Sequence, residues 1–104
     1  MISWHYVYIL LSQKDAHFYI GSSDNVFHRV QQHNLGLNVS TAPRRPLTLI
    51  YYEAHRSKKD ALRRENYFKT TKGKVTLRSI IRSFLKSTDN ASPRVLPLAC
   101  TRTK

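Results

Sequence analysis

Two short segments near the start of the chain, rich in aromatic and β-branched residues, constrain the fold most. Residues 4–12 read WHYVYILLS and residues 17–21 read HFYIG, a composition typical of β-strands. Residues 13–16 lie between them, which is the length of a hairpin loop. The start of the chain is therefore predicted to form a β-hairpin. Because both strands carry tyrosines, we expect the phenol groups to gather on one patch of the sheet.

The rest of the pattern predicts helices around one more strand. In chain order, the expected elements are a helix over 25–33 capped by Ser23 or Asp24, a strand over 47–54, a helix over 57–69 opened by Ser57 with Asp60, and, after a break at 70–73, a helix to about residue 86. The order β-β-α-β-α-α predicts an α+β domain, a small three-stranded antiparallel sheet flanked by helices. Residues 1–86 are expected to form the domain and 87–104, where the pattern disappears, a flexible tail.

The charge of the chain is strongly positive and unevenly placed. Eighteen Lys and Arg against six Asp and Glu give a net charge of +12, and residues 44–86 hold +10 of it. Such a field attracts polyanions through phosphate contacts and counterion release. DNA is the expected partner, with RNA as the alternative polyanion. The predicted nucleic-acid-binding residues are Arg44, Arg45, Arg63, Arg64, Lys69, Lys72 and Lys74.

Other classes of protein are disfavoured by what the sequence contains. The longest apolar run, residues 7–11, is too short to span a bilayer, and the basic segments carry core-forming residues rather than an exposed apolar face. A single cysteine, Cys100, excludes an internal disulfide and a cysteine-based zinc site. The expected compartment is the reducing cytoplasm.

One carboxylate stands on the apolar side of a predicted helix. At about 100° per residue, Glu65 lies between Leu62 and Phe68 on the wheel. A carboxylate directed at a core is unfavourable unless it is paired, hydrogen-bonded or bound to a metal. Two structural explanations are an ion pair with an arginine and a helix rotated so that Glu65 reaches the rim. The functional explanation is a ligand for Mg²⁺, which commonly uses carboxylates together with phosphate and water.

Four short motifs together resemble a known family. They are, in chain order, Tyr6-Val7-Tyr8, Tyr19-Ile20-Gly21, Arg29 with His33, and Arg63-Arg64-Glu65. The first two resemble the halves of the GIY-YIG nuclease signature, with the final tyrosine of the first half retained. The others resemble the Arg-x-x-x-His element and the metal-binding segment of that family. The resemblance covers about residues 4–86, and the closest likeness is to small stand-alone bacterial members related to the incision domain of the excision-repair nuclease.

The resemblance implies hydrolysis of a phosphodiester bond with one divalent cation, Mg²⁺ or Mn²⁺. Carried over by position, Glu65 would hold the metal and Tyr8 would orient, or deprotonate, the attacking water. The remaining expected site residues are Tyr19 at the water or phosphate, Arg29 on the scissile phosphate and His33 hydrogen-bonded within the same cluster. These groups are expected to share one shallow hollow.

The sequence therefore favours a metal-dependent DNA endonuclease that selects structure rather than sequence and belongs to DNA repair. The alternative is a catalytically weak or inactive basic nucleic-acid-binding module. It stays open because several family members carry a supporting asparagine beyond the metal-binding glutamate, where this chain reads Val75-Thr76-Leu77.

Overall fold

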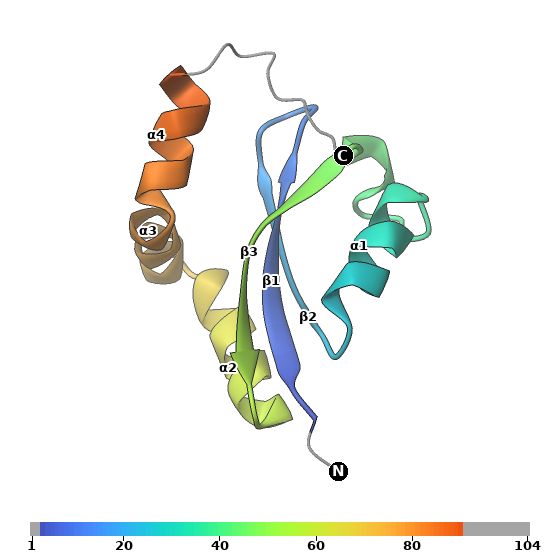
Figure 1. Cartoon of the computed structure of the whole chain (residues 1–104), viewed down its shortest axis with the longest axis vertical. Helices are drawn as coiled ribbons and strands as arrows, with labels where there is room; N and C mark the ends of the chain where they lie inside the picture. The colour runs from blue at the N-terminus through green and yellow to red at the C-terminus, as the bar shows by residue number, and fades with distance from the viewer. Residues whose placement is uncertain (1–2, 91–104) are drawn as a thin grey trace.

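A computed structural model describes residues 3–90, and its sheet has helices on both faces (Figure 1). The elements are β1 (His5–Ser12), β2 (Phe18–Ser23), α1 (Val26–Asn34), the short 3₁₀ helix η1 (Ala42–Arg44), β3 (Leu47–His55), α2 (Lys58–Phe68), α3 (Thr71–Ile80) and α4 (Arg82–Asn90). The predicted α+β class and the order of strands and helices are confirmed. Of the predicted tail, residues 87–90 belong to α4, and residues 91–104, with Cys100, lie outside the described part.

The hairpin strand β1 forms the centre of the sheet. The strand order is β2-β1-β3, and β1 pairs antiparallel with both neighbours. Tyr8 faces Gly21 across one ladder and Tyr52 across the other. Successive side chains of a strand point to opposite faces, so β1 contributes to two cores at once.

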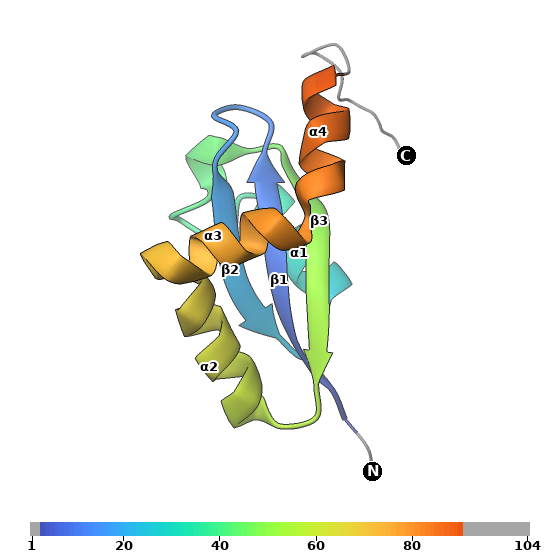
Figure 2. The same ribbon diagram turned by 90° about the vertical axis from the view of Figure 1, so that its left-hand side faces the viewer.

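The two cores lie on opposite faces of the sheet. Val7 and Ile9 pack with Ala61, Phe68 and Leu77 from α2 and α3. The other face buries Tyr8, Leu10, Val26 and Leu47, with Tyr6, Tyr19, Val30 and Leu49 packed against them. Figure 2 shows α2 and α3 in front of the sheet and α1 behind it. The tyrosines of both hairpin strands thus meet on the α1 face, as predicted.

The ends of α1 are set by local hydrogen bonds. The side chain of Asn25 accepts from the backbone N–H of His28, so Asn25 is the N-cap and the expected caps, Ser23 and Asp24, lie two residues and one residue too early. The helix ends before Gly36, whose φ of +81° is the left-handed conformation that stops helices.

The last predicted helix is divided, and the prediction of one continuous helix is wrong. The break between α2 and α3 lies at Lys69 and Thr70, where the Thr70 hydroxyl accepts from the Gly73 N–H, so Gly73 belongs to α3. α3 then ends at Ile80, and Ile81 leaves the helical conformation while staying 5% exposed. No proline or glycine occurs between residues 74 and 90 to indicate this break. The break coincides with a buried residue, Ile81, which the local sequence does not mark.

Candidate active site

A buried aromatic cluster stands at the centre of the candidate site. The Tyr8 hydroxyl lies 3.0 Å from Nε2 of His33, and both side chains are fully buried. The Tyr19 ring lies 4.8 Å from the His33 ring and 6.3 Å from the Tyr8 ring, between centroids. Both tyrosines come from the hairpin and His33 from the last turn of α1. The structure therefore brings three of the five predicted site residues into direct contact.

The hydrogen bonds of His33 run in one direction. Nδ1 lies 2.8 Å from the Thr41 hydroxyl, which in turn donates to the Asn38 carbonyl at 3.4 Å. With the Thr41 proton directed at Asn38, the Thr41 oxygen accepts from Nδ1–H and Nε2 carries the lone pair, and this is the tautomer we assign to His33. Nε2 accordingly accepts from the Tyr8 hydroxyl. The Tyr8 oxygen keeps its own lone pairs for another donor, and the Arg29 guanidinium acts on it as one.

Gly21 makes room for the Tyr8 phenol at the edge strand. A Cβ atom at Gly21 would lie 2.6 Å from the Tyr8 hydroxyl oxygen, 2.7 Å from Tyr8 Cζ and 3.1 Å from Tyr19 Cε2. The two residues are direct cross-strand partners, so any side chain there would enter the same space. The glycine thus lets the phenol lie across β2, at the outer edge of the sheet.

Arg29 lies beside this cluster on α1, half-buried. Its Nη1 donates to the Gln32 side chain at 2.8 Å, and its guanidinium acts on both Tyr8 and His33. Arg29, Gln32 and His33 line a hollow of about 140 Å³ together with Leu37 and Asn38. A charged guanidinium at a hollow of this size is suited to one phosphate group.

Both titratable groups of the central pair are neutral at neutral pH. Burial raises the pKa of Tyr8 above its usual 10.0, although the hydrogen-bonding guanidinium of Arg29 opposes the rise. Burial, and then the charge of Arg29, lowers the pKa of His33 below its usual 6.5. The phenol therefore keeps its proton, and His33 is an unprotonated acceptor for it.

Glu65 reaches the same strand from the other face of the sheet. Its Oε1 accepts from the Ser22 hydroxyl at 2.7 Å, and its Oε2 lies 2.9 Å from Lys69 Nζ. The Glu65 side chain is 16% exposed, and its charge acts on Tyr8. The five predicted residues thus straddle the edge strand β2: four lie on the α1 side and Glu65 lies on the α2 side. The ion pair considered in the sequence exists, with a lysine rather than an arginine.

The donor atoms at Glu65 fit a hard divalent cation. A carboxylate and a serine hydroxyl are oxygen ligands of the kind Mg²⁺ prefers. Among residues 3–90, no cluster of three or more His, Cys, Asp or Glu side chains could hold a metal ion. Water and substrate phosphate would have to complete the coordination shell, and Lys69 would have to leave Oε2.

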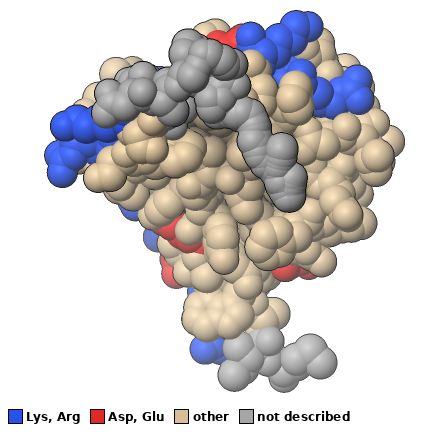
Figure 3. All heavy atoms as spheres, turned by 45° about the horizontal axis from the view of Figure 1, so that its top comes forward, with Lys and Arg blue, Asp and Glu red and all other residues tan. Residues whose placement is uncertain are grey.

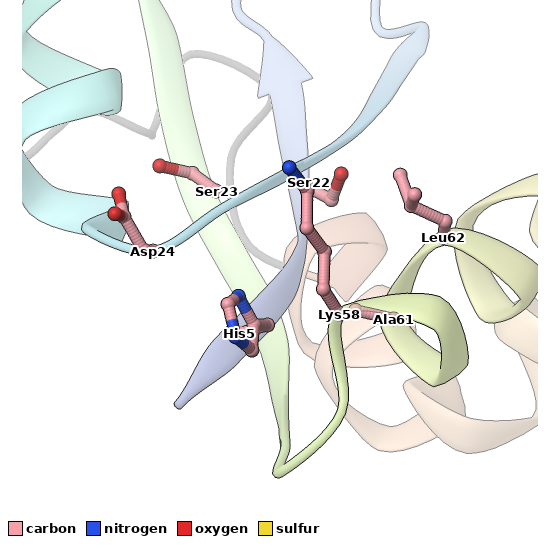
Figure 4. A pocket seen from close by; sticks show the side chains of 7 residues that line it. All are labelled: His5, Ser22, Ser23, Asp24, Lys58, Ala61 and Leu62. Carbon is pink, nitrogen blue, oxygen red and sulfur yellow. The ribbon is translucent and has the colours of Figure 1, made fainter. Parts of the chain in front are cut away.

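A second hollow adjoins Glu65 on the α2 side. It has a volume of about 280 Å³ and is lined by His5, Ser22, Ser23, Asp24, Lys58, Ala61 and Leu62 (Figure 4). The figure shows the Lys58 side chain extending from the start of α2 toward β2. The Ser22 hydroxyl belongs both to this hollow and to the hydrogen bond with Glu65. Of the five predicted site residues, Arg29 and His33 line the hollow on the α1 side, and Glu65 meets the second hollow through its bond to Ser22.

Two of the predicted nucleic-acid-binding arginines, Arg44 and Arg64, join separate elements of the fold. Arg64 donates to Glu53 through both Nε and Nη2, at 2.9 and 3.0 Å, and its guanidinium lies 4.4 Å from the Phe68 ring. Arg44 lies 3.3 Å from Asp15 and donates to the Phe18 carbonyl. These contacts tie α2 to β3 and η1 to the hairpin, so both guanidinium groups have fewer donors left for phosphate.

The other predicted basic residues are more accessible. Arg45, Lys72 and Lys74 are exposed; Arg63 is exposed too and pairs with Asp60, and Lys69 pairs with Glu65. On the face seen in Figure 3, groups of Lys and Arg side chains are visible at the left margin and at the upper right. Within residues 3–90, no helix is long and apolar enough to cross a membrane.

Three residues of this site have no distinct signal in the sequence. Thr41 lies in the loop after α1 and Ser22 follows the Tyr19-Ile20-Gly21 motif, and both act through contacts with residues far along the chain. Glu53, on β3, accepts the hydrogen bonds of Arg64.

The stretch of chain where several family members carry an asparagine holds no such side chain here. The Thr76 hydroxyl contacts Tyr67, Leu77 is buried and Val75 is exposed.

A comparison with models of protein families matches residues 4–78 to the GIY-YIG catalytic domain. The match covers most of the chain and includes Tyr8, Tyr19, Arg29, His33 and Glu65. The chain belongs to the GIY-YIG family.

Similar GIY-YIG proteins are small and bacterial. The UPF0213 protein of Staphylococcus haemolyticus is 42% identical over 77 residues, which cover 73% of this chain and 93% of the relative. A UPF0213 protein of Staphylococcus aureus is 39% identical with the same coverage. The solution NMR structure of a UPF0213 protein from Bacillus halodurans matches with a TM-score of 0.51 and 33% identity, over 86% of this chain and 97% of that one.

Proposed function

We propose that this GIY-YIG protein is a divalent-metal-dependent endonuclease that hydrolyses phosphodiester bonds in DNA. The observation that carries the proposal is the buried hydrogen bond between the Tyr8 hydroxyl and His33, with Arg29 beside it and Glu65 across the same edge strand. A buried polar cluster lowers the stability of a fold unless all its groups are hydrogen-bonded, so its presence at a sheet edge points to a functional role. The family match supports nuclease chemistry as that purpose.

The central pair accepts a proton from water. Tyr8 is neutral and already donates to Nε2, so its oxygen accepts a hydrogen bond from the attacking water molecule. As the water attacks phosphorus, its proton passes to the Tyr8 oxygen while the phenol proton moves to His33. Thr41 keeps Nδ1 as the protonated nitrogen, which holds Nε2 ready to accept. This route needs no phenolate before the reaction.

Arg29 stabilises the scissile phosphate. A guanidinium stays charged at every working pH and can bind two phosphate oxygens at once. Charge that develops on these oxygens in the transition state strengthens the interaction. Tyr19, whose ring lies tilted against that of His33, contacts the water or the phosphate from the other side of the pair.

Glu65 and the Ser22 hydroxyl would hold Mg²⁺ or Mn²⁺. The cation supplies positive charge for the phosphate oxygens or the leaving group. With a single carboxylate and a competing Lys69 ion pair at 2.9 Å, we expect weak metal binding without DNA and stronger binding in the complex, where phosphate completes the ligand set.

The basic residues that remain accessible bind the DNA backbone. Arg45, Arg63, Lys72 and Lys74 contact phosphate, which positions the duplex without reading its sequence. Arg44 and Arg64 serve chiefly to hold the fold. By analogy with the excision-repair members of the family, we further propose that the protein acts on branched, damaged or distorted DNA in a cytoplasmic repair process.

The second candidate is a nucleic-acid-binding module with weak or no turnover. Two observations favour it: both Glu65 oxygens already have partners, and Val75, Thr76 and Leu77 place no amide near Glu65. In that case RNA is as suitable a partner as DNA, because the contacts are to phosphate.

Cleavage of supercoiled and branched DNA with Mg²⁺ or Mn²⁺, and then with chelator, separates the two candidates. In Glu65→Ala and Arg29→Ala, cleavage should fall by about a hundredfold or more, while binding persists. The matched controls are Asp60→Ala, an exposed carboxylate of α2, and Arg56→Ala, an exposed arginine that lies 5.4 Å from the Trp4 ring; both should cut like wild type. A wild-type protein that binds but never cuts with either metal would establish the second candidate.

A further inference from the structure

The loop after α1 exposes three large apolar side chains. Leu35, Leu37 and Val39 are 70%, 68% and 88% exposed. Such side chains are individually common on surfaces, but three in one loop beside a candidate site are unusual. They mark a surface that is suited to contact with another molecule.

The loop is held in one conformation. The Leu37 N–H donates to the Gln32 carbonyl, and the Asn38 carbonyl accepts from the N–H groups of Thr41 and Ala42. The Asn38 side chain accepts from the N–H and hydroxyl of Ser40. These bonds hold the loop in a conformation that directs the three apolar side chains outward. The apolar side chains themselves take no part in the bonds.

The same loop is continuous with the candidate active site. Leu37 and Asn38 line the hollow that contains Arg29 and His33. Asn38 also accepts from the Thr41 hydroxyl, which holds His33. A phosphate bound by Arg29 would thus have the Leu37 side chain as its direct neighbour.

The stretch of sequence that contains the loop carries positive charge and no acidic residue of its own, although Asp15 from the hairpin pairs with Arg44. No Asp or Glu occurs in sequence between Asp24 and Glu53, a stretch that contains Arg29, Arg44 and Arg45. The Arg45 guanidinium packs against Gly36 inside the loop, 2.7 Å from the position of an added Cβ. Exposed apolar side chains beside Arg29 and Arg45 complement a nucleic acid, whose phosphates surround apolar base faces.

We propose that residues 35–39 form a wedge that enters DNA at an unstacked base step next to the cleaved phosphate. Apolar side chains inserted between bases open the stack and kink the duplex. The cost of this opening is least where bases are already unpaired. The wedge therefore selects branch points, flaps and mismatches without any base-specific hydrogen bond. This inference rests on the proposed function and specifies its substrate class.

Binding measured without divalent metal tests the wedge. The full-length protein is titrated by fluorescence anisotropy against a fully paired duplex and against the same duplex with a central single-stranded flap. In Leu37→Ser with Val39→Ser, affinity for the flapped DNA should fall about tenfold or more, and affinity for the duplex by less than about twofold. The control is Val75→Ser on α3, also 67% exposed, which should bind both probes like wild type.

A fluorescent base analogue at the branch point gives a second measure. Its emission should change on binding of wild type and of Val75→Ser, and much less with the double variant. Equal affinity of the double variant and wild type for the flapped probe would overturn the proposal. So would a wild-type dimer in sedimentation that the double variant abolishes, because the loop would then bind a second copy.

The outcomes for the wedge and for the endonuclease can be told apart. Loss of flap preference in the double variant, with no cleavage by wild type in either metal, would support the wedge and refute the endonuclease. Cleavage by wild type, with unchanged flap binding by the double variant, would refute the wedge alone. Thermal unfolding of the double variant should match that of Val75→Ser, because the substituted side chains are exposed.

Discussion

Replacement of Gly21 by alanine tests the packing on which the site depends. An added Cβ would lie 2.6 Å from the Tyr8 hydroxyl oxygen, and ordinary contact begins at 3.4 Å. The phenol would have to move by 0.8 Å, or β2 would have to shift away from β1. Tyr8 and His33 are both fully buried, so neither side chain has free space to enter.

The expected loss of stability has two parts. Overpacking of a core costs about 1–3 kcal/mol, and a strained or broken 3.0 Å bond between Tyr8 and His33 leaves buried groups unsatisfied at about 1–3 kcal/mol. Reduced freedom of the unfolded chain returns less than about 1 kcal/mol. The net destabilisation should be about 2–4 kcal/mol, which lowers Tm by about 10–20 °C in a domain of this size.

Chemical denaturation and thermal unfolding measure this loss, and Tyr8→Phe supplies the internal control. Tyr8→Phe removes the oxygen atom that makes the 2.6 Å contact but leaves Cζ at 2.7 Å. In the Tyr8→Phe background, Gly21→Ala should therefore cost about 1 kcal/mol less than in wild type. Cleavage by Gly21→Ala should fall by about a hundredfold, because a displacement near 1 Å misplaces the reacting groups.

The result that would refute this reasoning is a neutral substitution. If the free energy of unfolding of Gly21→Ala is within about 0.5 kcal/mol of wild type, the Tyr8 phenol does not occupy the space over Gly21. The same conclusion follows if the cost of Gly21→Ala is unchanged by Tyr8→Phe.

Three further predictions concern the neighbouring contacts. Thr41→Val should destabilise the protein by about 1–3 kcal/mol and shift the ¹⁵N signals of His33 toward the other tautomer. The control Thr41→Ser should retain the wild-type spectrum. An unchanged His33 tautomer in Thr41→Val would contradict the assigned direction of the bonds. The pKa of His33 is lowered from 6.5 in the folded state, so its contribution to stability is complete above pH 6.5 and declines as pH falls below that value. Urea titrations between pH 7.5 and 5.5 should show this loss in the free energy of unfolding for wild type but not for His33→Gln. Burial acts to raise the pKa of Glu53, but hydrogen bonds from Arg64 and Tyr51 outweigh it and hold the pKa below 4.5. The free energy of unfolding should therefore fall as pH drops below 4.5, and Glu53→Gln should cost about 1–2 kcal/mol at pH 7. If Glu53→Gln loses as much stability as wild type at acid pH, this carboxylate is not responsible.

Much of the fold follows from local patterns in the sequence. The aromatic and β-branched residues of 4–12 predict a strand, and the short spacing to residues 17–21 predicts a hairpin. The helical spacing of Val26 and Val30 places Arg29 and His33 on the flank beside the core. These predictions succeed because periodicity alone decides which side of an element is buried.

Other features depend on how the elements pack. The helix wheel places Glu65 inward but cannot say that its partners are Ser22 and Lys69. The basic character of Arg64 is visible in the sequence, whereas its commitment to Glu53 depends on the distance between α2 and β3. The break at Ile81 depends likewise on which apolar side chain the core accepts.

The sequence by itself determined the order of strands and helices, the tyrosine pair, and the side of each element that faces the core. Only the tertiary structure decided that Thr41 directs His33, that Gly21 makes room for Tyr8, and that Glu65 approaches β2 from the opposite face. The physical reason is range. Propensity and periodicity act between residues a few positions apart, whereas these contacts join residues 8 to 43 positions apart and are fixed by strand register and by the packing of helices on the sheet.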